Sequence, residues 1–418
     1  MQKTLLIYNF LYLVALIFIL PLEYFKRPTF LRKRWIREKF GFFEETESNL
    51  PTIWVHAVSV GEVSAVSKMI MELSNKYRIV LSTITDTGQR IAQERFKNYN
   101  VKVVYMPFDI SWAIKRFLKS FNPIAIIITE TELWPNLISI GSKNKPVIVV
   151  NGRISEKSFR GYSKIKFFIK PLIKKLSLIC VQEQNYKERF IAIGADKKKI
   201  HVTGNMKFDI ELKDIKFIWE DYIPSPVIIA GSTHEPEEDI ILDAFLKMNI
   251  KATLVIAPRH PERFSEVETL IREKIANINE EVFFSKLTDF FSKLTHQNRK
   301  FILLIDQMGI LGSLYRLCDF AIIGGSFIPH GGQNPLEPSF WKKPFVCGPY
   351  MHNFPFTEEF IREKACLSVD RKSLLEAMRK LAENHELRKS MGERAYQIFL
   401  KNSGATKKTL NLLEKFIL

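Results

Sequence analysis

From residue 52 onward, short and nearly unbroken apolar runs alternate with stretches of helical periodicity. Apolar runs of this kind are typical of strands that are buried on both faces. Helical crossovers between such strands make neighbouring strands parallel. The alternation therefore predicts doubly wound parallel sheets that are covered by helices on both faces.

The predicted strands fall into two groups along the chain. Those of the first half are Thr52–His56, Ile79–Thr83, Val101–Tyr105, Ile124–Thr129, Val147–Val150 and Leu176–Val181. Those of the second half are Val227–Ala230, Thr253–Ala257, Phe301–Ile305, Phe320–Ile323 and Phe345–Cys347. Helical stretches such as Glu62–Lys76 and Ile310–Leu317 separate them.

The pattern pauses before residue 227, and a length of 418 residues is that of about two domains. We therefore expect two doubly wound, Rossmann-like domains. The predicted segments are a membrane anchor with a basic flank (1–43), a first domain (44–210), a linker (211–226), a second domain (227–385) and a helical tail (386–418).

The N-terminal segment 5–22 carries no charge. Eighteen helical residues rise about 27 Å, the lower end of a bilayer crossing. Asn9 and Pro21 weaken that prediction, and the alternative is a helix that never spans, either buried in the protein or lying in the membrane interface. Seven basic residues follow the segment between positions 26 and 39, so the positive-inside rule leaves the rest of the chain in the cytoplasm.

The formal net charge of +17 is concentrated in two places. Residues 1–43 hold eight Lys and Arg against two acids, and residues 153–175 hold eight against one. No zinc-finger spacing or aromatic RNA-binding motif accompanies them, which argues against a nucleic-acid partner. The second stretch is either a solvated helix face or a contact with anionic lipid headgroups.

The sequence shows no metal-ligand pattern. Its four cysteines are far apart, and its histidines form no HExxH or HxH pair. We expect the thiols to pack as small apolar side chains in a reducing compartment, without a metal. The cysteines are Cys180, Cys318, Cys347 and Cys366.

Charged side chains follow the strands of the first half at the points where ligands bind in doubly wound sheets. Glu62 opens the helix after the first strand, with Gly61 permitting a tight turn. Glu62 is either a general base or a carboxylate stabilised by the helix dipole. Glu130 and Glu132 follow the fourth strand, where one acid is expected to cap the next helix. Lys207 lies just before the linker.

The second half is rich in anion-binding features. Glycine pairs at 324–325 and 331–332 precede predicted helix starts, where backbone N–H groups bind phosphate. Arg259 can add a bidentate contact, and Glu337 can accept from ribose hydroxyls. Neither a P-loop nor a GxGxxG motif is present. We expect a nucleotide in the second domain, with a carboxylate facing it across a cleft, an arrangement that suits a GT-B nucleotide-sugar transferase.

Seven motifs in collinear order add a family resemblance. They are HAVSVGE at 56–62, ETELWPN at 130–136, GNMKFD at 204–209, STHEPEE at 232–238, PRHPERF at 258–264, MGIL at 308–311 and GGSF…GGQNPLEP at 324–338. Together they resemble the 3-deoxy-D-manno-octulosonic acid (Kdo) transferases of lipopolysaccharide biosynthesis. The chain has Gln333 where the family commonly has His, and Met206 where it commonly has Leu.

The resemblance implies a metal- and cofactor-independent GT-B enzyme that is anchored at the cytoplasmic face of the inner membrane. Such an enzyme moves Kdo from CMP-Kdo onto a lipid A precursor, lipid IV-A, with inversion. Glu62 would be the general base, and Glu130 and Lys207 would support the transition state. The CMP moiety would contact Pro258, Arg259, Met308, Gly309, Ile310, Asn334, Pro335, Leu336 and Glu337.

Other functions stay open at this point. The nearest alternative is another membrane-associated GT-B enzyme that uses a UDP-sugar, either a lipid-linked sugar transferase or an epimerase. A non-catalytic membrane scaffold with a nucleotide fold is a second. The number of Kdo residues added is not readable from any motif.

Overall fold

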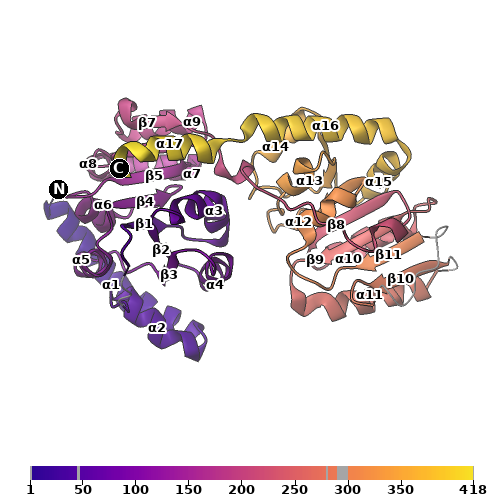
Figure 1. Cartoon of the computed structure of the whole chain (residues 1–418), viewed down its shortest axis with the longest axis horizontal. Helices are drawn as coiled ribbons and strands as arrows, with labels where there is room; N and C mark the ends of the chain where they lie inside the picture. Colours follow the sequence, from indigo (N-terminus) through magenta and orange to yellow (C-terminus); the bar gives the residue numbers. More distant parts are fainter. Residues whose placement is uncertain (1, 45–47, 279–280, 290–299, 418) are drawn as a thin grey trace. The chain divides into compact units, whose positions relative to one another are not determined.

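The computed structural model describes residues 2–44, 48–278, 281–289 and 300–417. The chain divides into two compact units (Figure 1). Unit 1 comprises Met1–Asp209 and Asn402–Leu418, and unit 2 comprises Ile210–Lys401.

Unit 1 is built on a parallel sheet with the strand order β3-β2-β1-β4-β5-β6-β7. Its strands are β1 (Thr52–His56), β2 (Arg78–Thr83), β3 (Val101–Tyr105), β4 (Ala125–Thr129), β5 (Val147–Gly152), β6 (Leu178–Val181) and β7 (Ile200–Val202). Its helices are α1 (Gln2–Lys26), α2 (Thr29–Lys39), α3 (Val60–Ser74), α4 (Asp86–Arg95), α5 (Ser111–Phe121), α6 (Pro135–Gly141), α7 (Glu156–Lys164), α8 (Lys166–Ile173), α9 (Gln184–Ile193) and α17 (Ala405–Ile417), with short 3-10 turns η1 (Lys197–Lys199) and η2 (Met206–Phe208).

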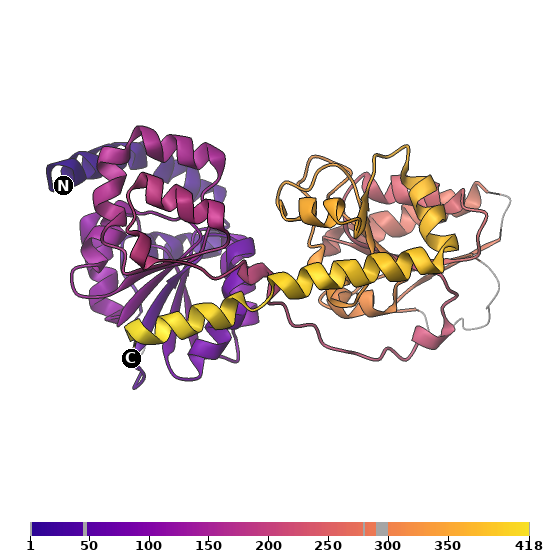
Figure 2. The same cartoon turned by 90° about the horizontal axis from the view of Figure 1, so that it is seen from above.

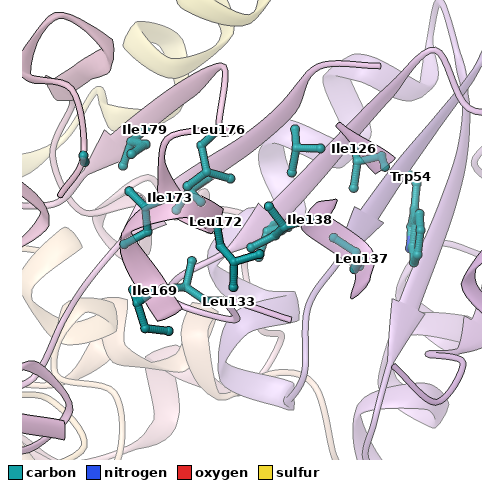
Figure 3. Close-up of a cluster of buried hydrophobic side chains, with 14 of the residues drawn as sticks. Trp54, Ile126, Leu133, Leu137, Ile138, Ile169, Leu172, Ile173, Leu176 and Ile179 are labelled. Carbon is teal, nitrogen blue, oxygen red and sulfur yellow. The ribbon is translucent and has the colours of Figure 1, made fainter. Parts of the chain in front are cut away.

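Both faces of this sheet are buried, as the unbroken apolar runs predict. Ile126 and Ile128 of β4 point into one hydrophobic cluster, which also holds Trp54 of β1 and Leu137 of α6 (Figure 3). Ile127, which lies between the two isoleucines, points into the cluster on the other face. Successive side chains of a strand point to opposite faces, so a strand that is apolar throughout requires helices on both sides.

Unit 2 repeats this plan with the order β10-β11-β9-β8-β12-β13-β14, again parallel. Its strands are β8 (Val227–Thr233), β9 (Thr253–Pro258), β10 (Val282–Lys286), β11 (Lys300–Leu304), β12 (Phe320–Ile323), β13 (Phe345–Cys347) and β14 (Cys366–Ser368). Its helices are α10 (Glu237–Leu246), α11 (Phe264–Ala276), α12 (Leu311–Leu314), α13 (Leu336–Phe340), α14 (Thr357–Arg362), α15 (Leu374–Glu383) and α16 (His385–Asn402), with 3-10 turns η3 (Glu220–Tyr222), η4 (Pro261–Arg263) and η6 (Tyr315–Leu317).

Three strands were not predicted from the sequence, namely β7, β10 and β14. All three lie at the edges of their sheets. In β7, His201 and Val202 are exposed, so the strand has no continuous apolar run. Edge strands pair on one side only, and each of these three holds a single buried residue, which removes the signal that identifies the other strands.

The C-terminal residues 386–418, expected as one helical tail, form two helices that belong to different units. Helix α16 lies mostly in unit 2, whereas α17 packs in unit 1 (Figure 2). Ala405 and Leu413 of α17 are buried in the same cluster as residues of α3. The Asp209 carboxylate fixes the start of α17 by accepting hydrogen bonds from the N–H groups of Gly404 and Thr406.

The linker segment before β8 packs on unit 2. Arg316 forms ion pairs with Asp214 and Glu220, and the Ser313 hydroxyl donates to the Lys213 carbonyl at 2.8 Å. Within the described residues, Thr4–Lys26 is the one helical stretch that is long and apolar enough to cross a membrane, with a mean hydropathy of 2.4.

Candidate active site

Glu62 lies in the first turn of α3, at the carboxyl edge of the sheet of unit 1. Its Oε2 accepts a hydrogen bond from the Val58 N–H at 2.8 Å, which turns the carboxylate back over the loop after β1. The sequence predicted a tight turn at Gly61, but in the structure Gly61 lies inside α3. A Cβ at Gly61 would meet only Ser59 Oγ, at 3.9 Å, so the space beside Glu62 is open on this side.

The surroundings of Glu62 make it a better proton acceptor than an ordinary carboxylate. The pKa of Glu62 is raised to about 8, chiefly by burial and in smaller part by the negative charges of Glu130 and Glu132. The Val58 N–H and the Lys207 ammonium oppose this by lowering the pKa. General-base catalysis is most efficient when the pKa of the base lies near the operating pH, so the position suits proton abstraction.

Glu130 and Lys207, each expected to support the transition state, lie together in unit 1. Their side chains form an ion pair, with Lys207 Nζ 3.8 Å from Glu130 Oε1. Glu130 has a φ of 57°, in the left-handed region that is unfavourable for a residue with a Cβ. Such strained positions cost about 1–3 kcal/mol and cluster at functional sites. The surrounding structure therefore holds Glu130 in one orientation beside Lys207.

Two asparagines position the lysine. The Asn205 side-chain oxygen accepts from the Lys207 N–H at 3.0 Å and caps η2. Asn151, at the end of β5, accepts from the Met206 N–H, also at 3.0 Å. Asn151 is buried, so the turn that carries Lys207 is tied to the sheet. Lys207 thus projects from a fixed turn.

The acids after β4 do not cap the following helix, contrary to the sequence-based expectation. The two carboxylate oxygens of Asp109 accept instead from the N–H groups of Asn136 and Leu137, at 2.9 and 2.8 Å. Asp109 lies just before α5, well away in sequence from the helix that it caps. Glu132 remains near Glu62, where burial raises its own pKa.

In unit 2, the loops after β8 and β12 approach each other closely at the carboxyl edge of the sheet. A Cβ at Gly324 would lie 2.2 Å from the Ser232 carbonyl oxygen, so only glycine fits there. The buried Glu237 carboxylate accepts from the N–H groups of Gly325, Phe327 and His234, at 2.5, 2.9 and 3.1 Å. Sequence reasoning gave Glu237 no role, because two of its three partners, Gly325 and Phe327, lie 88 and 90 residues further along the chain.

The residues expected to bind CMP surround the same edge. The Arg259 N–H donates to the Thr233 carbonyl at 3.0 Å, which joins the ends of β9 and β8. Asn334 accepts from the Leu336 N–H at the start of α13, and its amide lies 3.4 Å from Glu337 Oε1. Pro258 ends β9, Leu336 opens α13, and Met308, Gly309 and Ile310 precede α12. The CMP-binding role of these residues stays a prediction.

A cluster of imidazoles lies at this edge, and sequence reasoning assigned it no role. The ring centroid of His234 lies 4.1 Å from that of His330 and 5.4 Å from that of His260. Gln333 Nε2 contacts His234 Nε2 at 3.0 Å. The pKa of His234 is lowered to about 4, chiefly by burial and in smaller part by the nearby His330, His260 and Arg259. Each histidine follows a different strand, which is the only sequence signal that links them.

Comparison with known proteins identifies the family. Residues 34–210 match the family model described as 3-deoxy-D-manno-octulosonic-acid transferase (Kdo transferase). A Haemophilus influenzae protein named 3-deoxy-D-manno-octulosonic acid transferase is 32% identical over 411 residues, covering 94% of this chain and 93% of that protein. The chain belongs to the Kdo transferase family. It is therefore a glycosyltransferase, as the motifs predicted.

Two further comparisons extend this result. A Fusobacterium nucleatum protein named bifunctional glycosyltransferase/methyltransferase is 33% identical over 407 residues, and the chain spans 61% of its length. The structure of a UDP-GlcNAc 2-epimerase from Neisseria meningitidis covers 88% of this chain and 100% of its own, with a TM-score of 0.57 and 14% identity. At that identity the likeness shows the fold alone, and it confirms the GT-B fold class.

Proposed function

We propose that this Kdo transferase moves Kdo from CMP-Kdo to a lipid A precursor, lipid IV-A, at the cytoplasmic face of the inner membrane. The placement and elevated pKa of Glu62 carry the proposal. Its carboxylate takes the proton from an acceptor hydroxyl, and the oxygen attacks the anomeric carbon of Kdo. CMP leaves from the opposite side, so the anomeric centre inverts in one displacement.

The other charged residues support this displacement. Lys207 offsets negative charge on the sugar carboxylate or the departing phosphate, and Glu130 stabilises positive charge that develops on the sugar. In unit 2, Arg259 and the loop before α13 would bind the phosphate of CMP, while Glu337 would accept from its ribose. The absence of a metal or cofactor requirement stays part of the proposal.

Product analysis tests the donor and the acceptor together. The full-length chain is incubated with a tetra-acylated lipid A precursor and either CMP-Kdo or a UDP-sugar, and the products are weighed by mass spectrometry. We expect addition of Kdo from CMP-Kdo alone, and the mass gives the number of Kdo residues transferred. Transfer from a UDP-sugar with none from CMP-Kdo would establish the alternative GT-B function instead.

The pH dependence of kcat/KM should follow the protonation of Glu62. The base must be deprotonated, so kcat/KM is expected to rise about tenfold per pH unit and to level off near pH 8. Lys207→Met removes the cation that lowers this pKa, so the midpoint moves to higher pH. Glu130→Gln removes an anion that raises it, so the midpoint moves to lower pH. Midpoints that stay unchanged in both variants would contradict the assignment.

The imidazole cluster is expected to bind the carboxylate of the donor sugar. Kdo is an acidic sugar, and the exposed His330 lies beside His234, whose pKa Arg259 also lowers, so a carboxylate in this cluster would gain charge-assisted hydrogen bonds. We expect His330→Ala to raise the KM for CMP-Kdo about tenfold, a typical loss for one hydrogen bond to a charged group. The Kd for CMP, measured by calorimetry, should stay the same because CMP lacks that carboxylate. The exposed His385 on α16 gives the control variant His385→Ala, and an equal loss of CMP affinity in His330→Ala would argue against a carboxylate contact.

A further inference from the structure

One face of α1 is docked along the rest of unit 1. Every fourth residue from Tyr8 to Tyr24 is shielded from solvent, whereas the residues between them are mostly exposed. The members of this docking stripe are Tyr8, Tyr12, Leu16, Leu20 and Tyr24. Four of the five pack into the cluster that contains Trp35 of α2 and Phe108 of the loop after β3. A spacing of four residues places side chains on one face of a helix, so the docking runs along most of α1.

A polar seam at the N-terminal end of α1 strengthens the docking. The Tyr8 hydroxyl donates to Asp109 Oδ2 at 3.0 Å, and the Asn9 amide donates to Ser111 Oγ at 3.2 Å. The Asn136 amide donates in turn to the Asn9 side-chain oxygen at 2.8 Å. Asn9, which weakened the sequence-based prediction of a membrane span, therefore has specific partners on α5 and α6.

The C-terminal end of α1 is tied down by charge. Arg27, buried at the junction with α2, pairs with Asp86 at the start of α4, with its Nε 3.2 Å from Oδ1. The guanidinium also lies over the Trp35 ring, 4.2 Å from the centroid. The contacts with unit 1 thus extend from Tyr8 to Arg27, a rise of about 29 Å, which matches the hydrocarbon thickness of a bilayer.

This docking is incompatible with a bilayer crossing. A docked α1 that spanned the membrane would bring Asp109, Ser111 and Asn136 to the depth of the hydrocarbon core. Polar side chains and the loops that carry them are not tolerated there when lipid surrounds them. Either α1 crosses the membrane and leaves its partners, or it stays docked and lies in the membrane surface.

The outer face of α1 is apolar and continues onto α8. Its exposed side chains are Leu6, Ile7, Phe10, Leu11, Leu13, Val14, Ile17, Phe18, Ile19, Leu22 and Phe25. Tyr8 contacts Phe168 of α8, with ring centroids 6.2 Å apart, and the neighbouring Phe167 is 75% exposed. Lys164 and Lys166 flank this region and are exposed. Apolar side chains with a cationic rim fit a bilayer with anionic headgroups.

We propose that α1 lies in the membrane interface without crossing it, and that α1 and α8 together seat unit 1 on an anionic bilayer. This refines the membrane placement of the proposed function, whereas the transfer chemistry does not enter the argument. Part of the second basic stretch then serves this surface, since Lys164 ends α7 and Lys166 begins α8 beside α1 (Figure 1). The single spanning anchor expected from the positive-inside rule is replaced by an in-plane helix.

The side of the membrane on which the N-terminus lies decides between the two arrangements. The full-length variants Gln2→Cys and Lys26→Cys are treated with a membrane-impermeant maleimide in intact spheroplasts and in inside-out vesicles. The native cysteines are buried, which keeps background labelling low. We expect both variants to be labelled in inside-out vesicles only. Labelling of residue 2 in intact spheroplasts, with residue 26 protected, would overturn the proposal.

If the cysteine of Gln2→Cys reacts only after detergent is added, this also supports the in-plane arrangement. A crossing helix would instead place that cysteine in water on the far side of the membrane. The outcome does not depend on Kdo transfer, so a failure here is distinguishable from a failure of the proposed function.

The contribution of the junction between α7 and α8 is measured separately by co-sedimentation with phosphatidylglycerol vesicles at limiting lipid. We expect the double variant Lys164→Gln/Lys166→Gln to lower binding about tenfold or more, since each basic residue near an anionic surface strengthens binding about fivefold. The control Lys197→Gln/Lys198→Gln makes the same charge change at exposed residues of η1. Equal losses in the two double variants would exclude α8 from the membrane surface.

Discussion

Replacing Glu62 with glutamine is expected to lower kcat by about 10²–10⁴-fold, the usual contribution of a positioned general base. That range corresponds to about 3–5 kcal/mol of the activation barrier. Glutamine preserves the side-chain oxygen that accepts from Val58 and the size of the residue, so the start of α3 is expected to stay folded. The loss then reports the missing basicity alone, and steady-state kinetics with CMP-Kdo measures it.

The matched control for this variant is Glu72→Gln, which makes the same change at an exposed position of the same helix. Its kcat should equal that of the wild-type chain. The dissociation constant for CMP should be unchanged in both variants, because the hydroxyl that Glu62 deprotonates belongs to the acceptor and not to CMP. A Glu62→Gln variant with wild-type kcat would remove Glu62 from the mechanism.

Replacing Glu237 with alanine is expected to destabilise unit 2 by several kcal/mol and to abolish donor binding. The carboxylate is buried and satisfies three backbone N–H groups in the loops after β8 and β12. Each buried donor left without a partner costs about 1–3 kcal/mol. The loops after β8 and β12 lie at the edge of the sheet where the nucleotide is predicted to bind, so they would lose the geometry needed to bind it.

Urea unfolding and CMP calorimetry measure the two effects of Glu237→Ala. Asp239→Ala on the same helix provides the control, because the Asp239–Lys274 pair is partly exposed and such pairs contribute only about 0–1 kcal/mol. If Glu237→Ala were as stable as this control and bound CMP normally, the role of Glu237 in holding the loops would be wrong. Glu237→Gln should also destabilise unit 2, because the glutamine NH₂ group would face backbone N–H groups that need an acceptor.

Much of the fold follows from local sequence patterns. The central strands are apolar throughout because helices cover both faces of their sheets, so their positions could be predicted within a few residues. The edge strands β7, β10 and β14 lack that constraint and were missed. Glu62, Glu130 and Lys207 could be selected because each follows a strand, and parallel strands end at one edge of their sheet.

Partners that are distant in sequence could not be predicted in this way. Asp109 caps α6, Glu237 holds the loop after β12, and Asp209 fixes α17 against unit 1. No periodicity identifies these pairs, because each depends on which elements pack together in the folded chain. The same limit applies to the imidazole cluster of His234, His260 and His330, whose members come from three strand ends.

The sequence by itself determined the two parallel α/β sheets, the Kdo transferase family and the apolar character of α1. Those properties follow from residue type and spacing, which are local. Only the tertiary structure shows which face of α1 packs on the rest of unit 1, and the proposed in-plane arrangement depends on those contacts. Tyr8 and Asn9 bind Asp109 and Ser111 more than 100 residues away, and hydropathy carries no information about such contacts.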